Sequence, residues 1–594
     1  PLQGMPFGFP GLDRDRLQTM KEWLDAGAPG VAVAPASAEE LDALERWERF
    51  LNAPSNKAQL MSRYIFEHLF IGNLYFDELT GGSAWYKLVR SKTPPGEDIQ
   101  IIASRRPYDD PGSARFYYRL QPRGTSVVAK RHMPYALNDA RMKRWTQLFL
   151  EPDYTVNALP GYEGVESANP FITFGQLPVN ARYRFMLDEA HFTIMAYIKG
   201  PVCRGQVALN VIDDHFWVAF VKPNTADPDQ QAEFLSAQAN RMRLPQAKGS
   251  LVVSLIQWRG YARDQKRYLR AEAKAIAASL DKDQLRLDMN LIWDGGPEQN
   301  DNAALTVFRH FDSATVVKGL VGQQPSSMWV IDYSLLERIH YLLVAGFDVY
   351  GNVAHQLESR LYMDFLRMEG EQNFLLLLPA DARTAVRNRW YRGAKDHVKD
   401  FLLSPENAKF ERDTSVVFET DDPKSELMSM FYRRIPSARS ARFAVSRPSL
   451  INLMSAPGKA FSYLPEVAFV QILPASGEPQ SYTLIHNRAH SNNAQLFAEE
   501  DRLLPEEDTL TVARGFIGAY PNMFFQIAER ELPAFAAAIE QLGSDEDYTA
   551  LVERFGVRRT APWFWKLSDD LTAEYRAAHP VEAGLFDLNR YENR

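Results

Sequence analysis

The chain has 594 residues and a formal net charge of −8 at pH 7, with 45% hydrophobic and 24% charged residues. This balance is typical of a globular protein and excludes a mostly disordered chain. The lack of a basic excess argues against a nucleic-acid-binding surface, and no run approaches the roughly 18 apolar residues of a membrane-spanning helix. The length predicts three or four domains or subdomains.

Cysteine usage narrows the possibilities further. The single cysteine, Cys203, excludes an internal disulfide framework, a zinc ribbon and a C-x-x-C-H haem attachment within the chain. A cysteine-poor protein suits both the cytosol and the periplasm. The chain begins at Pro1 without a basic-then-apolar signal peptide, so we expect that its N-terminus has been processed or trimmed.

The first 37 residues predict a loop, one helix and a linker. The helix covers residues 14–25, and Leu17, Met20 and Leu24 form its apolar stripe. One helix cannot bury a core. We therefore expect the end of a domain whose beginning is absent, packed against the rest of the body beside an apolar concavity.

The rest of the chain alternates short strands and helices without regular βαβ spacing, which favours a multi-subdomain α+β class with mostly antiparallel strands. A capping box at Ser334 and Glu337 opens one helix, and no internal repeat is found. The other predicted helices cover 38–72, 138–150 and 529–542. Predicted strands cover 99–103, 115–120, 126–130, 251–257, 305–311, 315–320, 328–331, 467–473, 481–486 and 509–513, with a strand or helix end at 374–378 and a buried hairpin of 206–212 and 215–221 around Asp213-Asp214. The predicted domains are 1–37, 38–246, 247–458 and 459–594.

A search from the residues alone finds few catalytic patterns. There is no H-E-x-x-H, Walker loop or G-x-S-x-G. His486 and His490 have the i,i+4 spacing of two metal ligands on a helix, with a solvated loop as the alternative. Arg204 beside Cys203 would favour a thiolate, and the alternative is a small buried side chain at a tight turn. A soluble cytosolic hydrolase that uses Cys203 with His132 is one hypothesis.

Two clusters of cations beside aromatic residues suggest phosphate binding. The first contains Arg105, Arg106 and Tyr108, and the second contains Lys130 and Arg131. Solvated cations, or cations paired with neighbouring acids, are the alternative. We expect at least three cations to converge on one surface, among Arg105, Arg106, Lys130, Arg131 and Arg204.

Four strings in the first third of the chain carry a family resemblance. They are Gly4-Met5-Pro6-Phe7-Gly8, Arg105-Arg106-Pro107-Tyr108-Asp109-Asp110-Pro111-Gly112, His132-Met133-Pro134-Tyr135-Ala136-Leu137, and Ile198-Lys199-Gly200-Pro201-Val202-Cys203-Arg204-Gly205-Gln206-Val207-Ala208-Leu209-Asn210. Together they resemble the bacterial cis/trans isomerases of unsaturated fatty acids.

The resemblance implies a periplasmic enzyme that converts cis double bonds in phospholipid acyl chains to trans, with a covalently attached c-type haem and no energy source. Rotation about C=C requires a brief loss of π-bond order, which an oxidising haem iron could supply by withdrawing electron density. The substrate lies in a bilayer, so the protein needs transient contact with the membrane surface. The aromatic-rich stretch 64–79 is one candidate for this contact, with core packing as the alternative.

The chain also departs from this family. Members carry a C-x-x-C-H motif near the N-terminus, which is absent here. The opening loop resembles the end of a cytochrome c domain, which makes Met5 a candidate axial ligand of the haem iron; a loop anchor is the alternative. Two main hypotheses follow. One is an isomerase body without its haem-attachment segment, and the other is a non-catalytic lipid-binding or scaffold protein that has lost the haem.

Overall fold

A computed structural model gives the fold. It describes residues 8–30, 36–79, 84–113, 115–124, 127–162, 164, 166–199, 215–225, 227–245, 255–282, 285–310, 313–346, 353–394, 413–491 and 499–593. In this part of the chain, no helix is both long and apolar enough to cross a membrane. Helices and small mixed sheets alternate, which confirms the predicted α+β class.

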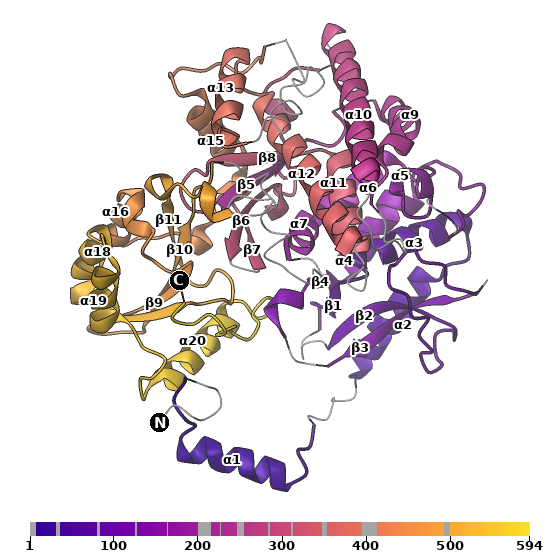
Figure 1. Cartoon of the computed structure of the whole chain (residues 1–594). Coiled ribbons are helices and arrows are strands. Elements are labelled where there is room, and N and C mark those ends of the chain that lie inside the picture. The colour runs from indigo at the N-terminus through magenta and orange to yellow at the C-terminus, as the bar shows by residue number, and fades with distance from the viewer. Residues whose placement is uncertain are drawn as a thin grey trace.

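Three four-stranded sheets in the described residues share one topology (Figure 1). In each sheet, three consecutive strands form an antiparallel meander, and the fourth strand crosses over to pair in parallel with the first. The first sheet contains β1 (Asn73–Phe76), β2 (Trp85–Ser91), β3 (Tyr117–Arg123) and β4 (Pro134–Leu137). The second contains β5 (His215–Phe220), β6 (Ala304–His310), β7 (Ser313–Lys318) and β8 (Ser327–Ile331), and the third β9 (Val467–Leu473), β10 (Gln480–Asn487), β11 (Thr509–Arg514) and β12 (Met523–Ala528).

The same helical feature follows the fourth strand of the first two sheets. Asn138 caps α4 (Asp139–Trp145) and Asp332 caps α11 (Tyr333–Ile339), each through its side chain. Each helix continues directly into a π-helical turn, over Thr146–Leu150 and His340–Ala345 respectively. In the third sheet, β12 leads through a 3₁₀ turn into α18 (Leu532–Glu540). The backbone therefore repeats a unit that the sequence does not reveal.

One hydrophobic core joins the first two sheets, and a second core surrounds the third sheet. The predicted boundary at 246/247 runs through the second sheet, because β5 lies before it and β6 to β8 lie after it. In addition to α4 and α11, the helices of the first core are α2 (Ala38–Leu51), α3 (Asn56–Leu69), α5 (Pro170–Thr173), α6 (Val179–Asp188), α7 (Ala190–Lys199), α9 (Pro228–Gln238), α10 (Leu255–Asp281), α12 (Val353–Leu375), α13 (Ala380–Trp390) and α15 (Pro423–Arg434). Those of the second are α16 (Pro448–Leu453), α17 (Gly458–Phe461), α18, α19 (Asp545–Phe555) and α20 (Phe564–Ala578).

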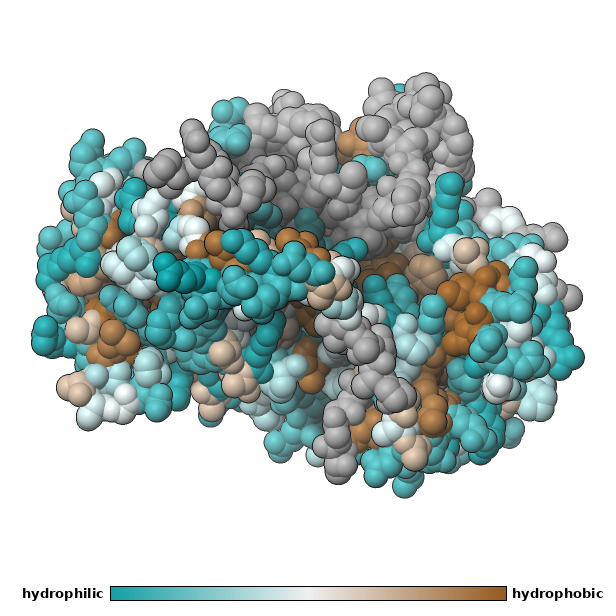
Figure 2. All heavy atoms as spheres, turned by 90° about the horizontal axis from the view of Figure 1, so that it is seen from below, coloured by the Kyte–Doolittle hydropathy of each residue, from teal (hydrophilic) through white to brown (hydrophobic). Residues whose placement is uncertain are grey.

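Helix α1 (Arg14–Asp25) forms as predicted, but it does not pack against the body. None of its residues is buried, and the side chains of the predicted stripe stay in solvent, with Leu24 55% exposed. An ion pair between Arg16 and Asp569 ties it to α20. Figure 1 shows it below the rest of the molecule, and Figure 2 shows this lower face as mostly hydrophilic with separated apolar patches. The prediction of a packed helix is therefore wrong, and the described residues of this segment show no cytochrome-like remnant.

Several local predictions need correction. Strand β5 pairs with β6 on one edge and β8 on the other, so it has no free edge for the predicted hairpin partner 206–212, which lies outside the described residues. Residues 129–131 form a 3₁₀ turn and 99–103 contribute an isolated bridge rather than a strand. Leu255 begins α10, where a strand was predicted. The side chain that caps α11 is Asp332 and not Ser334, because Asp332 Oδ1 accepts from the Leu335 amide.

The aromatic-rich stretch proposed for membrane contact belongs to the core. Every residue from Tyr64 to Leu69 is buried on α3. Tyr64 packs against Phe149, Phe174 and Phe185. This part of the stretch therefore packs inside the protein, as the alternative held.

Candidate functional site

A large apolar cavity lies at one edge of the second sheet, between α9, α10 and the end of β8. We call it the lateral cavity. Its volume is about 620 Å³, which is within the usual range for small-molecule sites. The wall is mainly apolar, with Phe234, Leu235, Ile276, Leu287, Leu291, Ile292, Leu376 and Leu377 among its residues.

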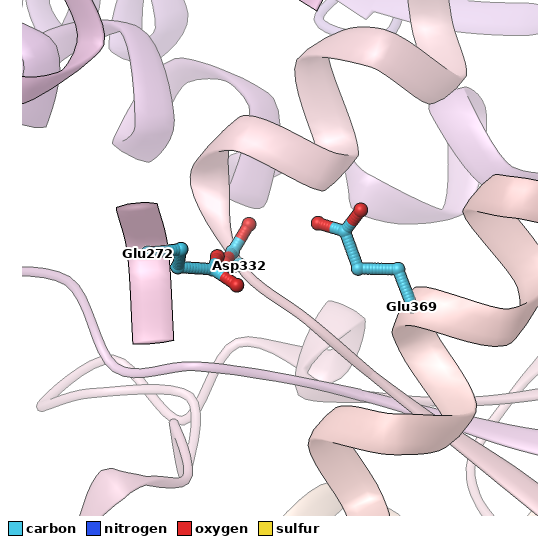
Figure 3. Close-up of side chains that lie close together, drawn as sticks. All are labelled: Glu272, Asp332 and Glu369. Atoms are coloured by element: carbon cyan, nitrogen blue, oxygen red, sulfur yellow. The ribbon is translucent and has the colours of Figure 1, made fainter. Parts of the chain in front are cut away.

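Polar groups gather at one wall of this cavity. Glu272 on α10, Asp332 at the start of α11 and Glu369 on α12 have carboxylate oxygens within 4.8 Å of one another. Figure 3 shows the carboxylate of Glu369 directed across the gap toward the other two. Of the three, Glu272 and Asp332 line the cavity. Oxygen ligands of this kind suit a hard divalent cation.

Each carboxylate already has donors inside the protein. Glu369 accepts from Gln265 at 2.7 Å and forms a completely buried ion pair with Arg338. Asp332 accepts from the hydroxyl of Ser334 at 2.9 Å. Glu272 accepts from the hydroxyl of Tyr268 at 3.0 Å. The three carboxylates therefore belong primarily to an internal hydrogen-bond network, and a cation site is the secondary interpretation.

The hydroxyls at this wall lack enough hydrogens for their contacts. Asp332, Ser334, Tyr268 and Glu272 form a chain with oxygen–oxygen distances of 2.9, 2.7 and 3.0 Å. Two hydroxyl hydrogens can fill only two of these three contacts. A third hydrogen on one terminal carboxyl group would fill them all. Burial, and then the neighbouring carboxylates, hold the pKa of Tyr268 well above its usual value, so the phenol keeps its proton. The hydroxyls of Tyr268 and Ser334 thus link two carboxyl groups beside an apolar cavity.

A second cavity, of about 420 Å³, lies at the opposite edge of the same sheet, along β7. We call it the central cavity because residues of all three sheet units line it. The two edges are three strand spacings, or about 14 Å, apart. Its histidine, basic and acidic lining residues are His132, His191, Lys199, Asp301, Lys318, Arg439, Arg442, His579 and Glu582.

The environment of the central cavity shifts several pKa values. Burial lowers the pKa of Lys199 to about 8, and its ammonium donates to the Ala129 carbonyl at 2.9 Å. Burial also lowers the pKa of His191. Glu582 is the opposite case: the partial loss of solvent alone would raise its pKa, but the hydrogen bond with His579 and the charges of His191 and Arg442 lower it to about 2. Glu582 therefore stays ionised at every ordinary pH.

His132 borders the central cavity, and both of its ring nitrogens are engaged. Nδ1 contacts the Asn73 amide at 2.8 Å, and Nε2 contacts the Val581 carbonyl at 2.7 Å. Burial lowers its pKa to about 4. A neutral ring that donates through Nε2 and accepts through Nδ1 satisfies both contacts. His132 thus has a structural role here that would hinder general-base chemistry. Its suggested partner, Cys203, lies outside the described residues.

The predicted phosphate cations occupy two separate places. Lys130 and Arg131 belong to the turn before β4, where Trp85 at the start of β2 packs on His132 at 4.6 Å. Arg105 and Arg106 belong to a loop that also contains Asp109. Arg90, near the end of β2, donates to the Asp109 carbonyl of this loop. Trp85 and Arg90 are five residues apart on β2, or about 17 Å.

These four cations therefore lie at two places along β2, and the convergence of at least three cations on one surface stays a prediction. Arg106 pairs with Asp109 at 3.0 Å, as the alternative of neighbouring acids held. Tyr108 is buried, and burial raises its pKa above the usual range. Arg204, the fifth cation, lies outside the described residues.

The haem expectation can be tested against the donors of this chain. Two thioether bonds require two cysteines, and the chain has one. Met5, the candidate axial ligand, lies outside the described residues. The residues present therefore do not fit a haem c attached through two thioether bonds.

His486 has protein partners instead of the predicted metal site. Its Nε2 contacts Asp508 at 2.8 Å, and it lies on a strand, β10, and not on a helix. His490 forms an isolated bridge with Leu503 beyond the end of that strand. The i,i+4 spacing does not place two imidazoles side by side on a strand, because four residues of extended chain span about 13 Å.

Sequence reasoning missed the residues of the lateral cavity wall. Asp332 offered one local signal, since an acidic residue directly after a strand and before a helix is a typical N-cap. Glu272 and Glu369 stand on long helices that no motif distinguishes. Tyr268 lies one turn before Glu272 on α10, but its contact with Ser334 exists only in the folded chain.

Comparison with known proteins gives one match. The model of the family described as fatty acid cis/trans isomerase (CTI) matches residues 1–593. No curated protein and no solved structure matches the chain. The match covers the regions of both cavities and all three sheets. The chain therefore belongs to the fatty acid cis/trans isomerase family.

Proposed function

We propose that the protein converts cis double bonds of unsaturated acyl chains in membrane phospholipids to trans. The observation that carries this proposal is the family match over residues 1–593. The lateral cavity supports it with an apolar enclosure for a hydrocarbon chain. Periplasmic location and a phospholipid substrate are parts of the proposal that rest on the family resemblance.

The chain's own residues would bind and orient the alkene. Apolar side chains such as Phe234, Ile276 and Leu376 would exclude water along the hydrocarbon, because burial of each CH₂ group is worth about 0.8 kcal/mol. The polar wall, with Glu272 and Asp332, would mark one end of the cavity. No net oxidation or hydration is required, so the reaction needs only a short-lived loss of π-bond order and a cavity wide enough for rotation.

The haem remains a prediction from the resemblance. Because the residues of this chain do not fit two thioether bonds, we expect the isolated 594-residue chain to carry no covalent haem. Haem-stained denaturing gels of that chain should show no signal. A stained band would mean that Cys203 or another side chain holds the group after all.

The experiment blocks the lateral cavity. The gene's complete open reading frame is expressed in a bacterium that exports proteins and matures c-type haem, and the protein is incubated with vesicles that contain cis-monounsaturated phospholipid. Ala275→Trp places a large ring in the lateral cavity, whereas Ala271→Trp changes a position on the same helix that does not line it. The trans/cis ratio is read by gas chromatography of the fatty acid methyl esters.

Wild type and Ala271→Trp should raise the trans/cis ratio. Ala275→Trp should lower the rate of isomerisation about ten-fold, which corresponds to a rise of about 1.4 kcal/mol in the activation barrier. Equal rates in both variants would remove the lateral cavity from the proposal. Vesicle binding without any change in the ratio would favour the alternative of a non-catalytic lipid-binding protein.

A further inference from the structure

Five cationic side chains lie along one face of α10. Their spacing of three and four residues puts them on the same side of the helix, over roughly 16 Å of its axis. They line an open surface hollow of about 370 Å³. We call this set the basic stripe: Arg259, Arg263, Lys266, Arg267 and Arg270.

The charge of the stripe is available at the surface. Arg259, Arg263 and Arg267 are exposed and, within the described residues, no carboxylate forms an ion pair with them. Asp264, the carboxylate inside this range, pairs with Arg243 at 2.8 Å. The whole chain has a net charge of −8, so this positive face contrasts with the rest of the protein.

The opposite face of α10 holds the helix in place. Gln265, Tyr268 and Leu269 are buried, and Gln265 donates to Glu369 on α12 at 2.7 Å. The same inner side provides Glu272 and Ile276 to the lateral cavity. The stripe is therefore a fixed, outward-facing surface, with the cavity behind it. In Figure 1, α10 projects from the top of the molecule, far from α1.

We propose that the basic stripe is a docking surface for an anionic phospholipid membrane. The choice of a membrane over other polyanions rests on the proposed function, because the substrate acyl chains reside in bilayers. Guanidinium groups match phosphodiesters through paired hydrogen bonds. A cation near an anionic bilayer gains attraction that weakens with salt. Docking along the stripe would put the lateral cavity about one helix diameter, or about 10 Å, from the lipid phosphates.

The test measures binding and not catalysis. Vesicles with fully saturated chains are used, so that no double bond is present and a failure of the proposed isomerase function leaves the result unaffected. One set of vesicles contains phosphatidylcholine alone, and the other contains phosphatidylglycerol in addition. The variant Arg259→Gln/Arg263→Gln/Arg267→Gln is compared with a charge-matched control, Arg49→Gln/Arg554→Gln/Arg576→Gln, at exposed positions on other helices.

The wild-type protein and the control should partition onto the anionic vesicles, less so at 0.5 M salt, and the stripe variant should lose about 100-fold in partition coefficient, at about five-fold per cation. Circular dichroism spectra that match the wild type would show that the variants are folded. Equal binding by the two variants would overturn the proposal. It would also fail if the wild type bound both vesicle types equally, or bound a polyanion such as heparin or RNA but not the anionic vesicles.

Discussion

The two cavities at opposite edges of the second sheet have different chemistry. The lateral cavity is mainly apolar and concentrates its polar groups at one wall, where the hydroxyls of Tyr268 and Ser334 link Glu272 to Asp332. The central cavity distributes histidines, cations and acids around its lining. One sheet thus supports an enclosure suited to a hydrocarbon and another suited to charge. The difference lies in the helices and loops that cover each edge.

The test with the largest expected effect breaks the buried ion pair between Arg338 and Glu369 behind the polar wall of the lateral cavity. Glu369→Gln would leave Arg338 buried without its carboxylate, and we expect the free energy of unfolding to fall by about 3–5 kcal/mol. Urea denaturation measures the change. The double variant Arg338→Met/Glu369→Leu removes both charges and should recover most of the loss. If the double variant were as unstable as the single one, packing and not charge would explain the effect.

The next test concerns His132 at the central cavity. Its pKa is about 4 in the folded protein, against a usual value of about 6.5. Between these values the unfolded chain binds a proton that the folded protein does not. Stability should therefore be complete above pH 6.5 and fall by about 2–3 kcal/mol as the pH drops to 4. His132→Gln should remove this slope, whatever its absolute stability. An unchanged slope between pH 6.5 and 4 would assign the acid sensitivity to other groups.

A smaller effect should follow from the hydrogen-bonded chain of hydroxyl and carboxyl groups at the lateral wall. Tyr268→Phe deletes the hydroxyl between Ser334 and Glu272, and the loss should cost about 1–2 kcal/mol of unfolding free energy. Tyr261→Phe is the control on the same helix. The ring of Tyr261 packs against Tyr362 and is only partly buried against the core. Thermal or urea denaturation measures the unfolding free energy of both variants. Equal effects would mean that the hydroxyl of Tyr268 adds nothing beyond its ring.

The smallest expected effect concerns Glu582 in the central cavity. Its folded pKa is depressed to about 2, so the ionised form stabilises the protein above the unfolded value of about 4.5, and this gain is lost as the pH falls toward 2. The side chain is 44% exposed, so water screens the interaction and we expect only about 1 kcal/mol. The unfolding free energies of wild type and Glu582→Gln should differ near pH 6 and converge near pH 2. A difference that stays constant with pH would contradict this account.

Local patterns predicted individual elements well where one rule acted alone. The apolar alternation of β9 to β11 and the stripe of α1 gave their bounds closely. The prediction failed at Leu255, where an apolar run begins a long helix, because short apolar runs do not distinguish strands from helices. It also failed for the hairpin at β5, because the pairing partners come from residues 304–331. The order of strands along the sequence does not determine which strand pairs with each edge of β5.

The sequence by itself determined the α+β class, the family resemblance and the exclusion of two thioether bonds, because these depend on composition and on strings of adjacent residues. Only the tertiary structure revealed the three recurring sheets, whose side chains differ while their backbone hydrogen bonds agree. It alone brought Glu272 on α10, Asp332 before α11 and Glu369 on α12 together. It also left the stripe of α1 in solvent. Periodicity states which face of an element is apolar, but burial depends on which other elements lie within reach.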